Sequence, residues 1–420
     1  MSDEQQYLEN GLLNAREASR ELARCDHATI RAVLETLAER TIASEEEILQ
    51  ANLSDLSRMP ESDPKYDRLL LNSQRLADIA NDLRAVAALP TPVGEVLEQR
   101  TLENGLELSK IRVPMGVIAV IFESRPNVTF DVFALCLKTQ NACVLKGSSD
   151  AHDTNRVVVR IMHEVLLENG IIPDVVFLAP PQREYLPKIL RATESIDLAI
   201  PRGSKGLIDF VRDNARIPVI ETGAGIVHTY VDASADLEKA KSIITNAKTR
   251  RVSVCNALDT LVLHRDLLQT LPGLMRSMGE DFAVEVYADD EAFQALDGDY
   301  AGRLRLASAE HFGTEFLSLK MSIKTVSGLA DAMEHIHRYS SKHSEAIVAE
   351  DPQVLEQFLN GVDAAAVYAN TSTAFTDGGQ FGMGAEIGIS TQKLHARGPM
   401  ALPELTSYKW VVRGSGQIRG

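Results

Sequence analysis

The chain has 420 residues, of which 45% are hydrophobic and 24% charged, and its formal net charge at pH 7 is −16. These ordinary globular values exclude an intrinsically disordered chain and a small disulfide-stapled scaffold. A surface this acidic repels phosphate backbones and anionic headgroups, which disfavours non-specific nucleic-acid binding but permits a local basic site for a small anion. At about 150 residues per domain, the length predicts two or three domains.

The cysteines and the N-terminus predict a soluble, cytoplasmic protein with reduced thiols. Its few cysteines are scattered and show neither a CxxC zinc spacing nor a disulfide framework: Cys25, Cys136, Cys143 and Cys255. The first ten residues, MSDEQQYLEN, are acidic and polar and contain no apolar signal segment. The apolar runs, such as residues 117–122, are too short to span a membrane.

The first 94 residues are predicted to be mainly helical. Ile30, Val33, Leu34 and Leu37 recur at helical spacing and mark one buried face. Two prolines in segment 58–64 interrupt that pattern.

Residues 95–113 predict a β-hairpin that leaves the domain as an arm. Asn104-Gly105 separates two strand-like halves, and this pair is typical of a type I′ turn. The strand-like tail 406–420 is expected to pair with this hairpin, in its own or a neighbouring subunit.

From Gly116 onward, short apolar strands alternate with helices, a pattern typical of parallel, doubly wound α/β sheets. A first unit is expected to place strands at 116–122, 141–147, 175–180, 197–203 and 218–222. After Val231 the alternation resumes, with a helix at 235–250 and strands at 257–264, 282–289, 316–327, 344–351 and 364–371. The sequence therefore predicts two α/β units plus an arm.

Cys255 is the most suggestive thiol, because cations precede it in the segment TRRVSVC. Lys248, Arg250 and Arg251 could lower its pKa, expose a nucleophilic thiolate and attract an anionic leaving group. A buried, inert cysteine is the commoner fate of a single cytosolic thiol, and that alternative is preferred for Cys25, Cys136 and Cys143.

Two turns that follow predicted strands could hold phosphate groups. One carries Lys146 and Gly147, and the other carries Gly203 and Ser204 and opens a helix. Such turns are common, and the segment 221–228 lacks the last glycine of a GxGxxG fingerprint. His335, His337 and His343 are interpreted as solvent-facing or hydrogen-bonded rather than as metal ligands, because no further ligands accompany them.

Long blocks of the chain together resemble the γ-glutamyl phosphate reductase (glutamate-5-semialdehyde dehydrogenase) family of the aldehyde dehydrogenase superfamily. The resemblance is carried by PMGVIAVIFESRPNVT, DLAIPRGSKGLIDFV, IPVIETGAG, NAKTRRVSVCNALDTLVLH, HSEAIVAED, GMGAEIGISTQKLHARGPMAL and TSYKWVVRGSGQIR, and so covers nearly the whole chain. The chain departs from the family pattern at Val252, where a proline is usual, in ETGAGI (221–226), where ETGTGN is often found, and in the turn KGSSDA.

The resemblance implies a role for several residues. Cys255 matches the catalytic thiol, Asn127 the oxyanion-hole amide, and Glu221 the superfamily's general-base glutamate. Cofactor contacts are implied for Lys146 at the adenine-side ribose, for Gly203 and Ser204 at the pyrophosphate, and for Glu315 at the nicotinamide ribose. No metal is implied.

The implied activity is the NADPH-dependent reduction of L-glutamyl 5-phosphate to L-glutamate 5-semialdehyde through a cysteine thioester, in proline biosynthesis. The alternative enzyme is an NAD(P)-dependent aldehyde dehydrogenase that oxidises a semialdehyde to a free acid. A nucleic-acid clamp at the G-x-x-G of residues 203–206 is a third class, which the acidic charge disfavours.

The predicted organisation has three parts. Residues 1–94 and 114–232 form the NADPH-binding domain, 233–385 the catalytic domain with the thiol, and 95–113 with 400–420 the oligomerisation hairpin and tail. The expected partners are a small-molecule substrate, which glutamate 5-kinase could hand over, and further copies of the chain in a dimer or tetramer.

Overall fold

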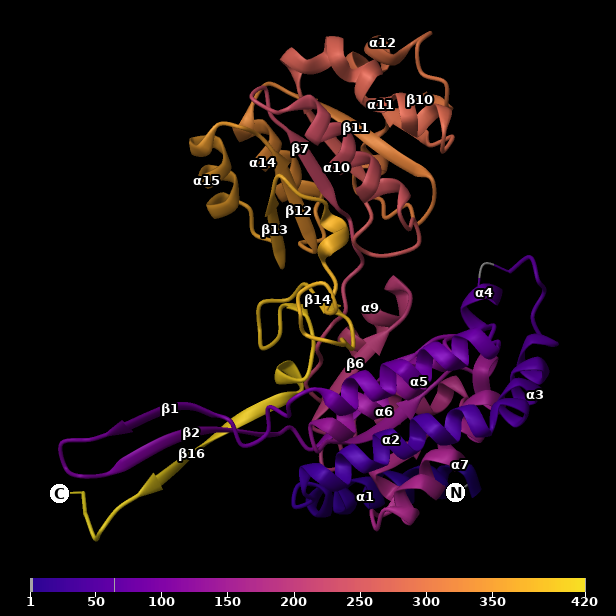
Figure 1. Cartoon of the computed structure of the whole chain (residues 1–420), viewed down its shortest axis with the longest axis vertical. Coiled ribbons are helices and arrows are strands. Elements are labelled where there is room, and N and C mark those ends of the chain that lie inside the picture. The colour runs from indigo at the N-terminus through magenta and orange to yellow at the C-terminus, as the bar shows by residue number, and fades with distance from the viewer. Residues whose placement is uncertain (1–2, 64, 420) are drawn as a thin grey trace. The chain divides into compact units, whose positions relative to one another are not determined.

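The computed structural model describes residues 3–63 and 65–419 and divides into two compact units (Figure 1). Unit 1 comprises Met1–Thr222, Gly382–Gly388 and Met400–Gly420, and unit 2 comprises Gly223–Phe381 and Ile389–Pro399. The first two residues of the acidic N-terminal segment, and Pro64 of the interrupting segment, lie outside the described residues. Among the described residues, no helix combines the length and apolarity needed to cross a membrane.

Unit 1 begins with the predicted helical region. Ile30, Val33, Leu34 and Leu37 are all buried, which confirms the predicted face. The helices are α1 (Asp3–Leu22), α2 (His27–Ala43), α3 (Glu45–Leu56), α4 (Tyr66–Leu69) and α5 (Ser73–Ala88).

A parallel sheet in the order β5-β4-β3-β6 follows in unit 1. All six residues of β3 are buried, because helices such as α1, α6 and α7 pack on the strands. The elements in chain order are β3 (Val117–Phe122), α6 (Pro126–Lys138), β4 (Ala142–Lys146), η1 (Ser149–Ala151), α7 (His152–Glu168), η2 (Pro173–Val175), β5 (Val176–Leu178), η3 (Arg183–Tyr185), α8 (Leu186–Ile189), β6 (Leu198–Arg202) and α9 (Lys205–Asn214).

The strand predicted at 218–222 is not formed. Val219 makes only an isolated bridge with Ala199, and Pro218 has no N–H to donate to a ladder. This segment extends along β6 for a single bridge and then leaves unit 1.

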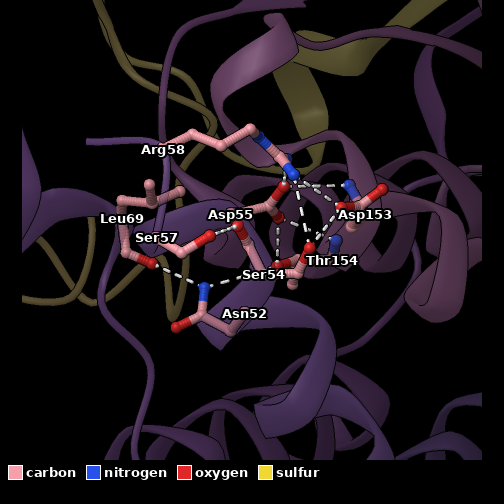
Figure 2. Close-up of polar contacts among 8 residues, drawn as sticks. All are labelled: Asn52, Ser54, Asp55, Ser57, Arg58, Leu69, Asp153 and Thr154. Carbon is pink, nitrogen blue, oxygen red and sulfur yellow. Dashed lines mark hydrogen bonds and ion pairs between the residues drawn. The ribbon is translucent and has the colours of Figure 1, made fainter.

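Asp55 of α3 holds the start of α7, as Figure 2 shows. Its buried carboxylate accepts the backbone N–H groups of Asp153 at 3.1 Å and Thr154 at 2.8 Å, and the Thr154 hydroxyl at 2.6 Å. Arg58 pairs with both Asp55 and Asp153, and this contact lowers the pKa of Asp153. Because the first N–H groups of a helix have no partner within it, this carboxylate ties α3 to α7.

The predicted arm is present as an antiparallel sheet of β1 (Val96–Thr101), β2 (Glu107–Pro114) and β16 (Thr406–Arg413), which lie side by side in Figure 1. The tail pairs with the hairpin of its own chain. The predicted type I′ turn is wrong, because Leu102 and Leu106 close a three-residue loop in which only Gly105, at φ +82°, has a positive φ. The Asn104 side chain instead accepts the Leu106 N–H at 3.2 Å.

Unit 2 is built on a parallel sheet in the order β10-β9-β11-β8-β7-β12-β13. Side chains alternate between its faces: Val231 and Leu261 pack towards α10 and α11, whereas Tyr230 and Val262 pack towards α14 and α15. The elements are β7 (His228–Val231), α10 (Leu237–Thr249), β8 (Thr260–His264), η4 (Arg265–Thr270), α11 (Leu271–Glu280), β9 (Glu285–Ala288), α12 (Asp290–Leu296), β10 (Leu304–Leu306), α13 (Ala309–Phe312), β11 (Lys320–Val326), α14 (Leu329–Tyr339), β12 (Ser344–Val348), α15 (Pro352–Gly361), β13 (Ala366–Ala369), η5 (Thr373–Phe375), β14 (Ile389–Ser390) and β15 (Gly398–Pro399), while η6 (Pro403–Leu405) follows in unit 1.

The predicted boundary after residue 232 is misplaced. Strand β7 pairs with β8 and β12, so the chain passes into unit 2 at Gly223. The segment 389–399 also returns to unit 2, where β14 pairs with β15. The predicted two-unit α/β organisation is otherwise present.

Candidate active site

The residues singled out from the sequence divide between the two units. Unit 1 carries Asn127, Lys146, Gly203, Ser204 and Glu221. Unit 2 carries Lys248, Arg250, Arg251, Cys255 and Glu315.

In unit 1 the candidate cofactor residues lie at the carboxyl edge of the sheet. Lys146 ends β4, while Gly203 and Ser204 follow β6 directly. From β3 the chain adds β4 and β5 on one side of the sheet and then places β6 on the other side of β3. Open α/β sheets bind ligands at such a switch point.

Ser204 caps helix α9, but a carboxylate already contacts it. Its hydroxyl accepts the Leu207 N–H at 3.4 Å, while its backbone N–H donates to Glu123 Oε2 at 3.0 Å and its hydroxyl lies 3.2 Å from Glu123 Oε1. A Cβ atom at Gly203 would come within 2.8 Å of Glu123 Oε2, so glycine permits this close approach. Sequence reasoning missed Glu123, which stands beyond the end of β3.

Lys146 is buried at the end of β4. Its ammonium donates to the Pro181 carbonyl at 2.8 Å and to the Gly147 carbonyl at 3.1 Å. Burial, assisted by the nearby Arg183 charge, lowers its pKa to about 8.

Asn127 lies in the first turn of α6 with an exposed side chain. Its amide Nδ2 donates to Asp131 Oδ2 at 3.2 Å, one turn further along the helix. Loss of solvation raises the pKa of Asp131 to about 7, the Asp82 charge adds to this rise, and Arg202 opposes it. The Asn127 amide thus turns one Nδ2 hydrogen towards Asp131 and has a second N–H for another acceptor.

Glu221 lies near the end of the first segment of unit 1, where it is half-buried. Its Oε2 is 3.7 Å from Arg212 Nη1 of α9.

In unit 2, Cys255 lies half-buried in the loop between α10 and β8. Gly225 packs directly on this loop, since a Cβ there would lie 1.5 Å from the Cys255 carbonyl oxygen, which no other residue type could tolerate. The Gly225 N–H donates to Glu315 Oε1 at 2.8 Å. Glu315 and Cys255 are therefore joined through one glycine.

The cations that precede Cys255 have different environments. Arg250 and Arg251 are exposed, whereas Lys248 is completely buried. The Lys248 ammonium donates to the Leu258 carbonyl at 2.9 Å and lies 4.0 Å from Asp259 Oδ1. Because this ammonium faces the protein interior, its geometry contradicts the phosphate contact expected from its place in the sequence.

Among the other cysteines, Cys136 and Cys143 are buried as expected, whereas Cys25 is half-buried in the turn that follows α1. His337 is exposed and His343 Nδ1 lies 2.7 Å from the Ser344 hydroxyl, as expected. His335 is instead buried in α14, and the described residues contain no His, Cys, Asp and Glu cluster that could hold a metal ion.

The fold is that of a known class of enzyme. The model of the aldehyde dehydrogenase family matches residues 3–283. An acetylating aldehyde dehydrogenase from Geobacillus thermoglucosidasius, only 18% identical, shares the fold over 99% of this chain and 98% of its own with a TM-score of 0.70. The chain belongs to the aldehyde dehydrogenase family.

Relatives that match nearly the whole chain share one name, γ-glutamyl phosphate reductase. The γ-glutamyl phosphate reductase of Pelodictyon phaeoclathratiforme is 60% identical over 97% of this chain and 98% of its own, and that of Legionella pneumophila strain Paris is 56% identical over 98% of both. The crystal structure of γ-glutamyl phosphate reductase from Thermotoga maritima is 40% identical and covers 98% of this chain and 100% of its own, with a TM-score of 0.95. The predicted resemblance to this family and the predicted aldehyde-dehydrogenase-like fold are confirmed.

Proposed function

We propose that the protein reduces L-glutamyl 5-phosphate to L-glutamate 5-semialdehyde and phosphate, with NADPH as the hydride donor, in the second step of proline biosynthesis. The proposal rests on identity of 60% over 97% of the chain with a γ-glutamyl phosphate reductase. The thiol that this chemistry needs is present as Cys255, in a loop flanked by the exposed Arg250 and Arg251.

Cys255 acts as the nucleophile. Its thiolate attacks the acyl carbon, and the bond from that carbon to the phosphate oxygen breaks with its electron pair on the departing phosphate. Arg250 and Arg251 attract that phosphate. Bound NADPH supplies the hydride that reduces the thioester, after which the thiohemiacetal releases the semialdehyde and regenerates the thiol.

Asn127 and the Cys255 backbone N–H stabilise the negative charge that forms on the carbonyl oxygen. One such donor typically contributes about 3 kcal/mol to the transition state. The hydrogen bond to Asp131 supports this role because it leaves the second Nδ2 hydrogen of Asn127 for the substrate.

The cofactor contacts follow the carboxyl edge of the unit 1 sheet. Lys146 holds the adenine-side ribose, Gly203 and Ser204 hold the pyrophosphate, and Glu315 of unit 2 holds the nicotinamide ribose. A helix start and a nearby ammonium suit an anionic dinucleotide. We further propose a preference for NADP over NAD.

Glu221 has no water to activate in a reaction that ends at the aldehyde. We assign it the positioning of Cys255 or the relay of the thiol proton. A homo-oligomer, a cytoplasmic location and delivery of the acyl phosphate by glutamate 5-kinase complete the proposal.

The test runs the reaction backwards with glutamate semialdehyde and NADP⁺, following NADPH with and without phosphate. Phosphate should be required, because attack by phosphate is the route from the thioester back to the acyl phosphate. Without it, a burst of about one NADPH per active site is expected. Sustained NADPH formation without phosphate, with free glutamate as product, would instead identify the acid-forming aldehyde dehydrogenase.

Cys255→Ser is the matched control in this assay. Its turnover should vanish while its melting temperature stays that of the wild type, since a hydroxyl of similar size cannot form the thioester. A variant with a near wild-type rate would refute the role of Cys255.

A further inference from the structure

Lys248 and Asp259 form a buried charged pair beneath the Cys255 loop. Lys248 lies in the last turn of α10 and Asp259 directly precedes β8, so the two residues flank the loop that carries the thiol. Their side chains are 0% and 3% exposed. Buried charges are retained in proteins only when their hydrogen bonds are satisfied.

Lys248 fixes one end of the loop. Its Nζ donates to the Leu258 carbonyl at 2.9 Å, across the loop from its own helix. The backbone reinforces this closure, because the Leu258 N–H donates to the Ala247 carbonyl at 3.0 Å.

Asp259 fixes two further segments. Its Oδ1 accepts the Phe316 N–H at 3.0 Å, and its Oδ2 accepts the Val227 N–H at 3.4 Å. Phe316 directly follows Glu315, and Val227 lies two residues after Gly225. One carboxylate therefore anchors both segments that meet at the hydrogen bond between Glu315 and Gly225.

These contacts form a closed path through the Cys255 loop. It runs from Lys248 through Asp259 to the Glu315 segment, then to Gly225, which packs on the Cys255 carbonyl. The two hydrogen bonds, at 3.0 and 2.8 Å, and the Lys248–Asp259 contact, at 4.0 Å, are partly or fully buried, so they restrict movement of the loop relative to Glu315.

We propose that Lys248 and Asp259 are positioning residues, which hold the Cys255 loop and the Glu315 segment in one fixed arrangement. This inference rests on the proposed function, in which Cys255 attacks the substrate and Glu315 contacts the cofactor. Misplacement by about 1 Å can cost about 100-fold in rate, so an anchor outside the reacting atoms can control turnover.

The test compares Lys248→Met with Lys138→Met. Lys138 is a matched control in unit 1, because it is also buried and donates to a backbone carbonyl, that of Ala87, at 2.7 Å. Lys248→Met should lower kcat about tenfold or more while KM for the semialdehyde changes less than about threefold. Lys138→Met should leave both constants unchanged.

The double variant Lys248→Met with Asp259→Asn separates positioning from stability. It leaves no unpaired buried charge, and its asparagine amide keeps one of the two acceptor oxygens, so its melting temperature should exceed that of Lys248→Met even if the single variant folds poorly. Its kcat should stay low, because the Leu258 carbonyl has still lost its donor. Recovery of kcat together with stability would overturn the proposal.

Hydrogen exchange provides a readout that does not depend on activity. In Lys248→Met, amide exchange in residues 223–227, 250–258 and 313–318 should rise about tenfold relative to the rest of unit 2. Uniform acceleration, or none, would show that the pair only stabilises the fold. If the wild type shows no phosphate-dependent turnover, the proposed function fails, and the exchange result still decides the positioning role.

Discussion

Glu123 places a carboxylate at the start of α9, where the pyrophosphate of the cofactor is expected to bind. Glu123→Gln removes this negative charge and keeps the side-chain shape. We expect the Kd for NADPH to fall about two- to fivefold, since a charge at a helix start contributes up to about 1 kcal/mol. Isothermal titration would measure the change, with exposed Glu98→Gln on β1 as the control. Unchanged or weaker binding would place the pyrophosphate away from Ser204.

The buried imidazole of His335 in unit 2 should make the stability of the protein depend on pH. It packs edge-on against Phe312 at 5.2 Å between ring centroids, and burial, with the charge of His228, lowers its pKa to about 3. Lys324 and Arg338 lower this pKa further, and Asp289 opposes them. Below about pH 6.5, the His335 imidazole binds a proton in the unfolded chain but not in the native state. The free energy of unfolding therefore decreases as the pH falls.

His335→Phe should therefore reduce the loss of stability on acidification. Between pH 7 and pH 5 the wild type should lose about 2 kcal/mol more than the variant in its free energy of unfolding. Urea unfolding at the two pH values measures this difference, and exposed His337→Gln should behave as the wild type. Equal losses in the wild type and in His335→Phe would show that this imidazole is protonated in the native state.

At the scale of elements, the junction between α3 and α7 depends on Asp55. Asp55→Ala should lower the free energy of unfolding by about 3 kcal/mol or more, because it leaves two helix N–H groups and part of the Arg58 charge without their buried partner. Urea unfolding of the variant measures this loss. Exposed Glu46→Ala, on the same helix, should change stability by less than about 0.5 kcal/mol. A small effect of Asp55→Ala would mean that water replaces the cap.

At the scale of the whole molecule, the arm carries apolar side chains that a monomer would leave in water. Val96 and Tyr408 are each 52% exposed, Val412 is 55% exposed and Trp410 is 42% exposed. An exposed apolar sheet of this kind is typical of an interaction surface. Its edges also present unpaired backbone groups that can pair with another chain.

Deletion of residues 406–420 should therefore yield monomers or insoluble protein. The loss of β16 exposes the whole edge of β2 as well as its apolar neighbours. Light scattering coupled to size-exclusion chromatography would measure the mass of the remaining soluble protein. A soluble, active species whose subunit number is unchanged would refute the assignment of the arm to oligomerisation.

The sequence alone determined the elements whose patterns are local. The apolar runs of β3, β4 and β6, the helical spacing around Leu34 and the Asn-Gly hairpin each depend on neighbours along the chain, so their residues sufficed to predict them. The choice of Cys255 as the candidate nucleophile also came from its own flanking residues and from the family resemblance.

The tertiary structure decided which of those residues face the interior and what they contact. Lys248 belongs to the same cationic segment as Arg250, yet it is buried, because Asp259 and the Leu258 carbonyl meet it from across the loop. The segment 218–222 has the apolar pattern of a strand but forms no continuous ladder, and beside β6 it makes the isolated bridge of Val219 with Ala199. Glu123 and Ser204 are distant along the chain and meet because β3 and β6 are neighbours in the sheet. Contacts of this kind depend on strand order and burial, which no local pattern specifies.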